Sequence, residues 1–155
     1  MAKKLALIAS KGSLDWAYPP FILASTAAAL DYDVQIFFTF YGLALLRKDL
    51  SDLKVSPLGN PAMPMPVPMP NLVQMLPGME SMATMMMKQK IASKGVASIE
   101  ELRTACLESG VKFIACQMTV DLFDFKSTDF IDGIEFGGAA TFFQFAGESD
   151  VQLFI

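Results

Sequence analysis

Residues 110–119, GVKFIACQMT, are the stretch from which the fold is predicted. The apolar centre of this stretch is rich in β-branched and aromatic side chains, with Gly110 in front and polar residues behind, which is typical of a buried parallel strand. Cys116 stands at the end of this strand, just before a predicted helix start. In open α/β sheets, ligands bind at the carboxyl edge, where helix N-termini direct their free N–H groups. A thiol at that edge can be held partly as the thiolate, which is its nucleophilic form.

The two cysteines of the chain have different expected roles. Cys116 is the candidate functional thiol, although a small buried hydrophobic residue is an equally good interpretation of its position. Cys106 lies seven residues after Ile99 and four after Leu102, on the apolar face of a predicted helix, which favours a buried structural role. About one strand length separates Cys106 from Cys116, so we expect no disulfide between them within one chain.

Alternating strands and helices are predicted along the chain, which favours an α/β fold. We expect a single domain over residues 1–155, a three-layer sandwich with a mainly parallel central sheet of about five strands and helices on both faces. The expected strands include residues 5–9, 34–39, 111–116 and 151–155, and the expected helices include residues 14–30, 40–47, 98–109 and a short one after Cys116.

Several local signals set the expected helix boundaries. Ser98 and Glu101 form a capping box at the start of one helix, and Gly110 ends that helix. The Pro19-Pro20 pair predicts a break or restart near the front of the first helix, because proline removes a backbone donor. Either Thr119 or Asp121 is expected to cap the helix after Cys116.

Residues 57–90 differ in composition from the rest of the chain, and we interpret them as a Met/Pro-rich insert. They hold seven of the nine prolines and nine of the eleven methionines. The proline-dense part, residues 61–70, predicts an extended, polyproline-like chain. The spacing of the methionines that follow predicts one helix face made of Met75, Met79, Met82 and Met86. This face could bind a partner, contact a membrane surface or, through its thioethers, hold Cu(I).

The overall composition excludes several classes of function. A net charge of −4 without a basic patch argues against nucleic-acid binding. The chain has no histidine, which excludes Ser-His-Asp and Cys-His catalysis and imidazole metal sites. Its two cysteines form neither a C-x-x-C pair nor a four-cysteine site, and nucleotide-binding glycine motifs are missing. We therefore expect no metal and no organic cofactor.

Hydropathy sets the expected association and location of the protein. Hydrophobic residues make up 53% of the chain and charged residues only 18%, which points to a homo-oligomer. The first residues lead directly into a strand-like run without a signal-peptide pattern, and no run of 18 apolar residues occurs. We expect a cytoplasmic protein, with membrane-surface contact through the methionine-rich segment as an alternative.

A second candidate site lies after the first predicted strand. Lys11, Gly12 and Ser13 stand at a predicted helix start, where a lysine and backbone N–H groups could hold an anion or contact a sulfur donor. An ordinary strand-to-helix turn is at least as good an explanation of these three residues.

The order of these motifs resembles the DsrE/DsrF-like sulfur-relay family, in the branch with a methionine-rich insert that is often labelled peroxiredoxin-like. The resemblance covers nearly the whole chain. Two positions depart from the family pattern: Met118-Thr119-Val120 replaces a common Met-Ser-Met run, and Asp124 stands where glycine is expected. The motifs that carry the resemblance are the turn at residues 10–12, FFTFYGL at 37–43, the methionine-rich insert, residues 102–112, ACQMT at 115–119, IDGIEFGGAAT at 131–141 and the terminal strand.

The resemblance implies an oligomeric α/β protein in which Cys116 accepts sulfane sulfur as a persulfide and passes it on. Thr119, in the same motif, is a candidate contact to the sulfur donor. Cys106 is a candidate auxiliary thiol, although it has no general counterpart in the family. The implied partners are TusA-like carriers, rhodaneses and the heterodisulfide-reductase-like sulfur-oxidising complex. Two hypotheses compete with a sulfurtransferase or sulfur carrier: a thiol peroxidase that uses Cys116, and a non-catalytic scaffold that acts through the methionine-rich segment.

Overall fold

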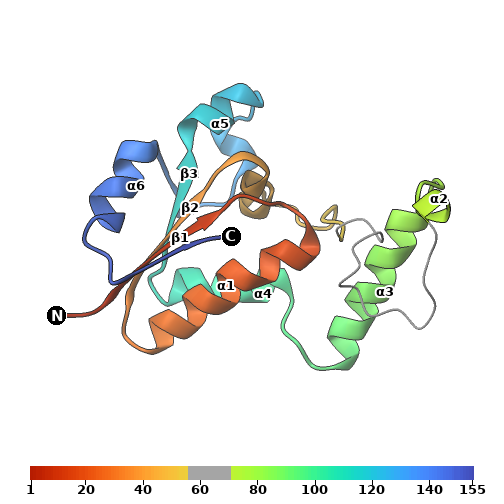
Figure 1. Ribbon diagram of the computed structural model, residues 1–155, viewed down its shortest axis with the longest axis horizontal. Helices are drawn as coiled ribbons and strands as arrows, with labels where there is room; N and C mark the ends of the chain where they lie inside the picture. Colours follow the sequence, from red (N-terminus) through yellow and green to blue (C-terminus); the bar gives the residue numbers. More distant parts are fainter. Residues whose placement is uncertain (56–70) are drawn as a thin grey trace.

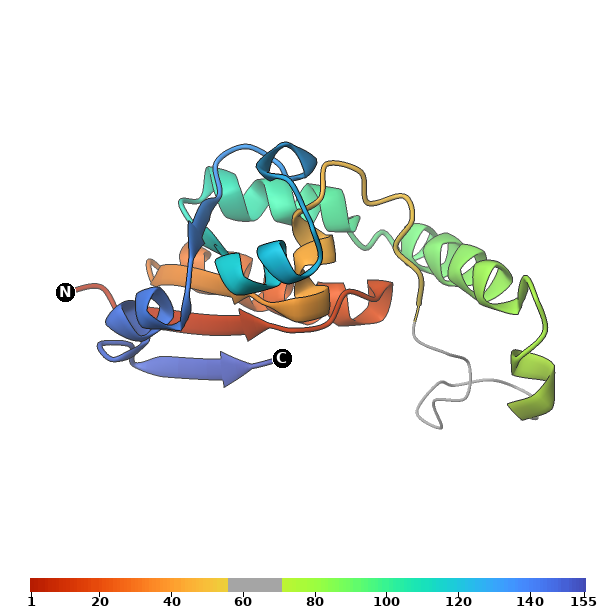
Figure 2. The same cartoon turned by 90° about the horizontal axis from the view of Figure 1, so that it is seen from above.

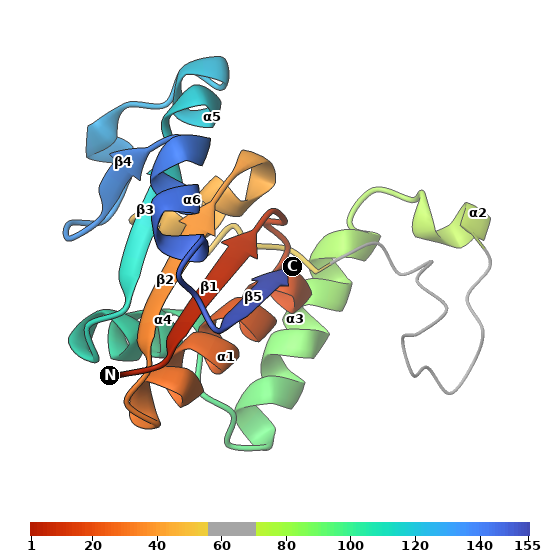
Figure 3. The same cartoon turned by 60° about the vertical axis from the view of Figure 1, so that its left-hand side comes forward.

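A five-stranded, all-parallel sheet forms the centre of the computed structural model, which describes residues 1–55 and 71–155. The strand order is β4-β3-β2-β1-β5, so the chain extends the sheet in one direction from β1 and then crosses back to add β5 at the other edge (Figure 3). The strands are β1 (Lys4–Ala9), β2 (Asp33–Phe38), β3 (Lys112–Cys116), β4 (Glu135–Gly137) and β5 (Val151–Phe154). The predicted α/β class with a parallel sheet is therefore confirmed.

Helices cover the sheet on both faces (Figure 1). Helices α1 and α4 pack side by side against one face, and α6 crosses the other face between β4 and β5. The helical segments are α1 (Leu14–Ala29), α2 (Asn71–Gln74), α3 (Met79–Ser93), α4 (Ile99–Glu108), α5 (Gln117–Leu122), α6 (Ala139–Ala146) and the 3-10 helices η1 (Phe40–Leu46) and η2 (Ser127–Asp129).

The core has two parts because strand side chains alternate between the two faces of the sheet. The larger cluster lies under α1 and α4 and includes Phe21, Phe38 and Phe113, whose rings contact one another. The smaller cluster lies under α6 and contains Cys116 together with Phe37 and other residues. The Cys116 side chain at the end of β3 therefore lies on the sheet face that α6 covers, where the core is smaller.

Helix α1 does not break at its prolines, so the predicted break near Pro19-Pro20 is wrong. The helix is continuous from Leu14 to Ala29 with both prolines inside it. Proline removes amide donors from the helix, but tertiary packing offsets this cost. Ala17 and Phe21 are fully buried on the face that contacts the sheet. That burial keeps the local sequence helical despite its low propensity.

The segment after β2 is a 3-10 helix, η1, rather than the predicted α-helix at residues 40–47. Its i→i+3 pattern is visible where Gly42 donates its N–H to the carbonyl of Thr39. The buried guanidinium of Arg103 on α4 donates to the carbonyls of Leu45, at 2.9 Å, and Arg47, at 2.7 Å. These bonds fix the end of η1 against α4.

The capping box at the start of α4 is confirmed. The Ser98 hydroxyl accepts from the Glu101 amide at 3.2 Å, and the Glu101 carboxylate accepts from the Ser98 amide at 2.8 Å. Gly110, with φ of 81°, ends the helix as predicted.

Helix α3 projects away from the sheet, as the view from above shows (Figure 2). Its contact with the body includes the Thr84 hydroxyl, which accepts from the amide of Val55 at 3.1 Å. Met79, Met82 and Met86 lie on α3, but Met75 follows the separate short helix α2, so the predicted four-methionine helix face is wrong at its first member. The two helices are separated at Pro77, which has no amide donor, and at Gly78, whose φ is 89°.

Part of the predicted insert cannot be compared with the structure. The polyproline-like segment at residues 61–70 lies outside the described residues. The division into one domain at residues 1–155 with an insert at residues 57–90 stays a prediction.

Candidate functional site

Cys116 is the last residue of β3, at the carboxyl edge of the sheet. It pairs in register with Gly137 of β4 and is the N-cap residue of α5. Only 5% of its surface is exposed, and its side chain shares the α6 face with Ile114 and Phe142. The strand places the thiol where the sequence predicts it, next to the start of a helix.

Four donors surround the sulfur of Cys116 and outweigh its burial. Burial by itself would raise the pKa of the thiol, because it disfavours the charged form. The hydroxyl and amide of Thr119, the hydroxyl of Thr39 and the amide of Met118 all favour the thiolate. Together they bring the pKa of Cys116 below its ordinary value.

Thr119 joins the site to the loop after β2. It is fully buried, and its hydroxyl accepts from the amide of Phe40 at 3.2 Å and lies 3.4 Å from the hydroxyl of Thr39. Neither Thr119 nor Asp121 caps the helix, contrary to the prediction, because the turn out of β3 is so tight that Cys116 itself takes the N-cap position. Thr119 instead lies inside α5 and faces the sheet.

Cys106 lies on the other face of the sheet, in the larger core cluster. Its thiol is fully buried and donates to the carbonyl of Phe21 at 3.4 Å. Burial raises the pKa of Cys106 to about 11. Both cysteines are free, as expected, and the sheet separates them.

Lys11, Gly12 and Ser13 line a separate open cavity of about 990 Å³. Five of the sixteen lining residues are aromatic and six are charged, among them Asp49, Asp52 and Glu80, and Cys116 does not line it. The ammonium of Lys11 lies 3.4 Å from the centre of the Trp16 ring, a cation–π contact. The lining includes Lys11, Gly12, Ser13, Trp16, Phe40, Tyr41, Arg47, Lys54, Phe123 and Phe125.

Gly12 has a packing role in this cavity wall. A Cβ at Gly12 would collide with the carbonyl oxygen of Tyr41 and would lie 3.0 Å from the Cβ of Ala44. A Cβ at Gly42 would collide with the carbonyl oxygen of Ala9. The two glycines therefore let the β1–α1 turn and η1 touch, and this contact brings Thr39 and Phe40 to the end of β3.

Three of the methionines of α3, Met82, Met85 and Met86, are exposed. Ala83 and Thr84 are buried, and Met87 packs partly against the core. At 100° per residue, Met82 and Met86 fall on the opposite side of the helix, and both are exposed. The methionine face is thus a free surface in this chain and not a core element.

Metal and membrane signals are not found in the part of the chain that the structure describes. Across residues 1–55 and 71–155, no three His, Cys, Asp or Glu side chains are grouped so that they could hold a metal ion. In the same residues, no helix has both the length and the apolar character that crossing a bilayer requires.

Comparison with known proteins agrees with this arrangement. The profile of the DsrE/DsrF/DrsH-like family matches residues 1–154. The chain belongs to this family. The resemblance noted from the motifs is thereby confirmed.

Two relatives match along nearly their whole length. Sulfur carrier protein DsrE2 of Allochromatium vinosum is 69% identical over 157 residues, covering 99% of this chain and 98% of that protein. The uncharacterized protein YrkE of Bacillus subtilis is 32% identical over 157 residues, covering 99% and 97% of the two chains.

A solved structure confirms the fold of this family member. The crystal structure of the ychN protein from E. coli superposes with a TM-score of 0.56 and covers 99% of both chains. Its sequence identity is 11%, so the likeness concerns the fold.

Sequence reasoning missed Thr39 as a partner of the thiol. Thr39 follows β2 directly, and β2 and β3 are neighbours in the sheet. Residues that follow adjacent parallel strands meet at the same edge. The positions of Thr39 and Cys116 after two strands could be predicted from the sequence. Their contact could not, because it depends on β2 and β3 being neighbours in the sheet.

Proposed function

We propose that this protein is a sulfur carrier of a sulfur relay, with Cys116 as the residue that holds the sulfur. The observation that carries the proposal is the setting of Cys116, a thiol with a lowered pKa at the carboxyl edge of a parallel sheet. A lowered pKa increases the share of thiolate, the nucleophilic form, and thiol exchange needs no metal or organic cofactor. The name of the relative from Allochromatium vinosum, sulfur carrier protein DsrE2, supports the same role.

The proposed loading step is a thiol exchange reaction. The Cys116 thiolate attacks the outer sulfur of a donor persulfide, a new S–S bond forms, and the donor leaves as its thiolate. The outer sulfur of Cys116 persulfide is then attacked by the thiolate of an acceptor, and Cys116 leaves as the thiolate. Sulfane sulfur moves in both steps without net oxidation or reduction.

The partners in this proposal are other thiol proteins of a relay. Following the family resemblance, we propose TusA-like carriers, rhodaneses and the heterodisulfide-reductase-like complex, in the cytoplasm. We also propose that the chain forms a homo-oligomer. We also propose that Lys11 contacts the sulfur donor. Lys11 follows β1 at the carboxyl edge of the sheet, the edge that also holds Cys116, and it lines the cavity described above.

Mass spectrometry of the intact protein tests the proposal. Wild type, Cys116→Ser and Cys106→Ser are exposed briefly to polysulfide, to tetrathionate or to hydrogen peroxide. We expect a gain of one sulfur from polysulfide, or of one thiosulfonate from tetrathionate, that disappears in Cys116→Ser and remains in Cys106→Ser. Modification by peroxide with no sulfur gain would replace the proposal with a thiol peroxidase. No modification at all would make Cys116 a structural residue.

The outward methionine face supports a second role, contact with an anionic membrane surface. Lys88 and Lys90 fall on either side of the face formed by Met82, Met85 and Met86 around the axis of α3. Lysines beside exposed methionines could contact the headgroups of anionic lipids. Flotation with vesicles rich in anionic lipid checks this role, and Met82→Glu with Met86→Glu should abolish the flotation.

A further inference from the structure

The segment of the chain that follows Cys116 carries a net negative charge. We define the acidic strap as residues 117–138, which run from α5 through η2 to β4. The strap holds five carboxylates and one lysine, a net charge of −4 that equals the net charge of the whole chain. All five carboxylates are exposed: Asp121, Asp124, Asp129, Asp132 and Glu135.

Three of these carboxylates lie closest to the thiol in the chain and in the sheet. Asp121 is on α5, which begins directly after Cys116, and Asp124 follows the end of α5. Glu135 pairs with Ile114, two residues before Cys116 in β3, and therefore shares the sheet face of the thiol. In the described part of the chain, the salt bridges join Lys4 to Glu148 and Lys54 to Glu80, and neither involves the strap.

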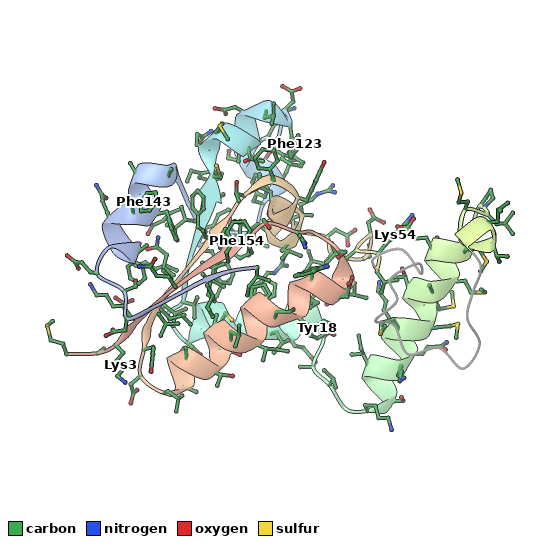
Figure 4. All side chains as sticks on the ribbon, in the orientation of Figure 1. Lys3, Tyr18, Lys54, Phe123, Phe143 and Phe154 are labelled. Carbon is green, nitrogen blue, oxygen red and sulfur yellow. The ribbon has the colours of Figure 1, made fainter. Side chains whose placement is uncertain are left out.

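Exposed apolar side chains accompany these charges. Met118 and Leu122 are four residues apart on α5, so they share one side of the helix, and they are 60% and 57% exposed. Phe143, on α6, is 68% exposed and stands clear of the body (Figure 4). A nearly buried thiol is thus bordered by helices that present apolar side chains to solvent, with carboxylates around them.

We infer that the acidic strap is the docking surface for the thiol partner of Cys116, and that this partner presents its cysteine among lysines or arginines and apolar side chains. The inference rests on the proposed transfer of sulfur from Cys116 and adds the chemistry of the partner. An apolar centre with a charged rim is the usual build of a specific, transient interface. A rim of charges of one sign favours partners of the opposite charge and raises their association rate.

The charge also argues against a second copy of this chain on the strap. Two copies that met strap to strap would bring two surfaces of net charge −4 together, and like charges across an interface are unfavourable. Because the carboxylates are exposed, salt should screen their effect over about 10 Å at 0.1 M ionic strength. The expected signature is therefore a salt-sensitive association rate.

Two synthetic cysteine peptides provide the test, identical except that lysines flank the cysteine in one and glutamates in the other. Persulfidated wild type is mixed with each peptide, and the sulfur that reaches the peptide is followed by mass spectrometry. We expect transfer to the lysine peptide to be about tenfold faster at low salt, with the difference lost near ~1 M KCl. Each transfer breaks the S–S bond of Cys116 persulfide and forms one on the peptide, which leaves the Cys116 thiolate.

Charge-neutralising variants separate docking from the intrinsic reactivity of the peptides. In Asp121→Asn with Asp124→Asn and Glu135→Gln, the preference for the lysine peptide should fall about threefold or more. The matched control is Asp31→Asn with Glu100→Gln and Glu108→Gln, which removes the same charge from the α1–α4 side. The control should keep the preference of the wild type.

A second readout keeps the inference testable if Cys116 carries no sulfur. Cys116 is converted to its thionitrobenzoate disulfide, and the release of thionitrobenzoate by each peptide is timed. The same peptide preference and the same loss in the strap variant would support the docking surface even if sulfur loading fails. Equal rates for both peptides in wild type would overturn it. A change of oligomer mass in the strap variant would also overturn it, because a second copy would then occupy the strap.

Discussion

Cys116 and Cys106 show how one residue type acquires two chemistries in one chain. Donors from Thr39, Met118 and Thr119 oppose the burial of Cys116 and bring the pKa of its thiol down. Burial is the main influence on the pKa of the Cys106 thiol and raises it to about 11. At neutral pH we therefore expect alkylating reagents to react with Cys116 before Cys106.

The reactivity of Cys116 should depend on the Thr119 hydroxyl. In Thr119→Val the thiolate loses a charge-assisted hydrogen bond, so the pKa of Cys116 rises and alkylation by iodoacetamide at pH 7 slows by about tenfold. The whole rate–pH curve should move to higher pH. Thr119→Ser keeps a hydroxyl and should stay near wild type. An unchanged curve in Thr119→Val would show that the backbone amides suffice.

Cys106 should make the protein sensitive to alkaline pH. Its pKa is 9.0 ordinarily and about 11 in the fold, so folding disfavours its thiolate. Burial of the neutral Cys106 thiol adds to the free energy of unfolding below pH 9. This contribution, about 2 kcal/mol, is lost as the pH rises toward 11. Urea unfolding of wild type and Cys106→Ala checks this, because their stabilities should converge by that amount between pH 8.5 and 11. Parallel pH profiles would contradict the prediction.

At the scale of elements, the site depends on the contact between the β1–α1 turn and η1. Gly12 and Gly42 are the points of closest approach, where any side chain would meet a backbone carbonyl. The same contact carries Thr39 and Phe40 toward Thr119. A glycine in a strand-to-helix turn often suggests an anion cradle, but here close packing explains it.

Gly12→Ala should therefore destabilise the fold. The added Cβ meets the carbonyl of Tyr41 and the Cβ of Ala44, an overpacking cost of about 1–3 kcal/mol in urea unfolding. Gly138→Ala is the control, since a Cβ there meets nothing within 4 Å and its φ of −110° suits alanine. If both variants unfold at the same urea concentration, the packing role of Gly12 is wrong.

At the scale of the whole molecule, many of the hydrophobic side chains lie at the surface. Every residue of β5, the edge strand, is exposed, and Phe154 has 73% of its surface free. Among residues 1–55 and 71–155, no further strand pairs with the outer edge of β5, which leaves backbone groups there without a ladder partner. This edge suits the expected contact between copies of the chain, and Phe154 lies on it (Figure 4).

Charges on β5 should therefore lower the oligomeric state. Leu153→Lys with Phe154→Lys places two cations on the edge strand, where burial against another copy would be costly. Sedimentation velocity should show a smaller species than wild type at the same concentration. Leu30→Lys, an exposed position at the end of α1, is the control and should leave the mass unchanged. A monomeric wild type would contradict the expected oligomer.

Much of the fold follows from local sequence. The strand before Cys116, the capping box at Ser98 and Glu101, and the helix stop at Gly110 all depend on residues close in the chain. The errors arose where tertiary contacts override local preference. Packing of Ala17 and Phe21 keeps α1 continuous through its prolines, and η1, which packs closely on Ala9 at Gly42, is a 3-10 helix.

The sequence by itself determined the strand, the edge position of Cys116 and the membership in the family, because apolar periodicity and motif order are properties of the linear chain. Only the tertiary structure decided the electrostatics of the site. The donors to Cys116 come partly from Thr39, 77 residues earlier, and hydrogen bonds depend on distance in space. It also decided that the sheet separates the two thiols and that Met82, Met85 and Met86 of α3 face solvent while Met87 packs against the core.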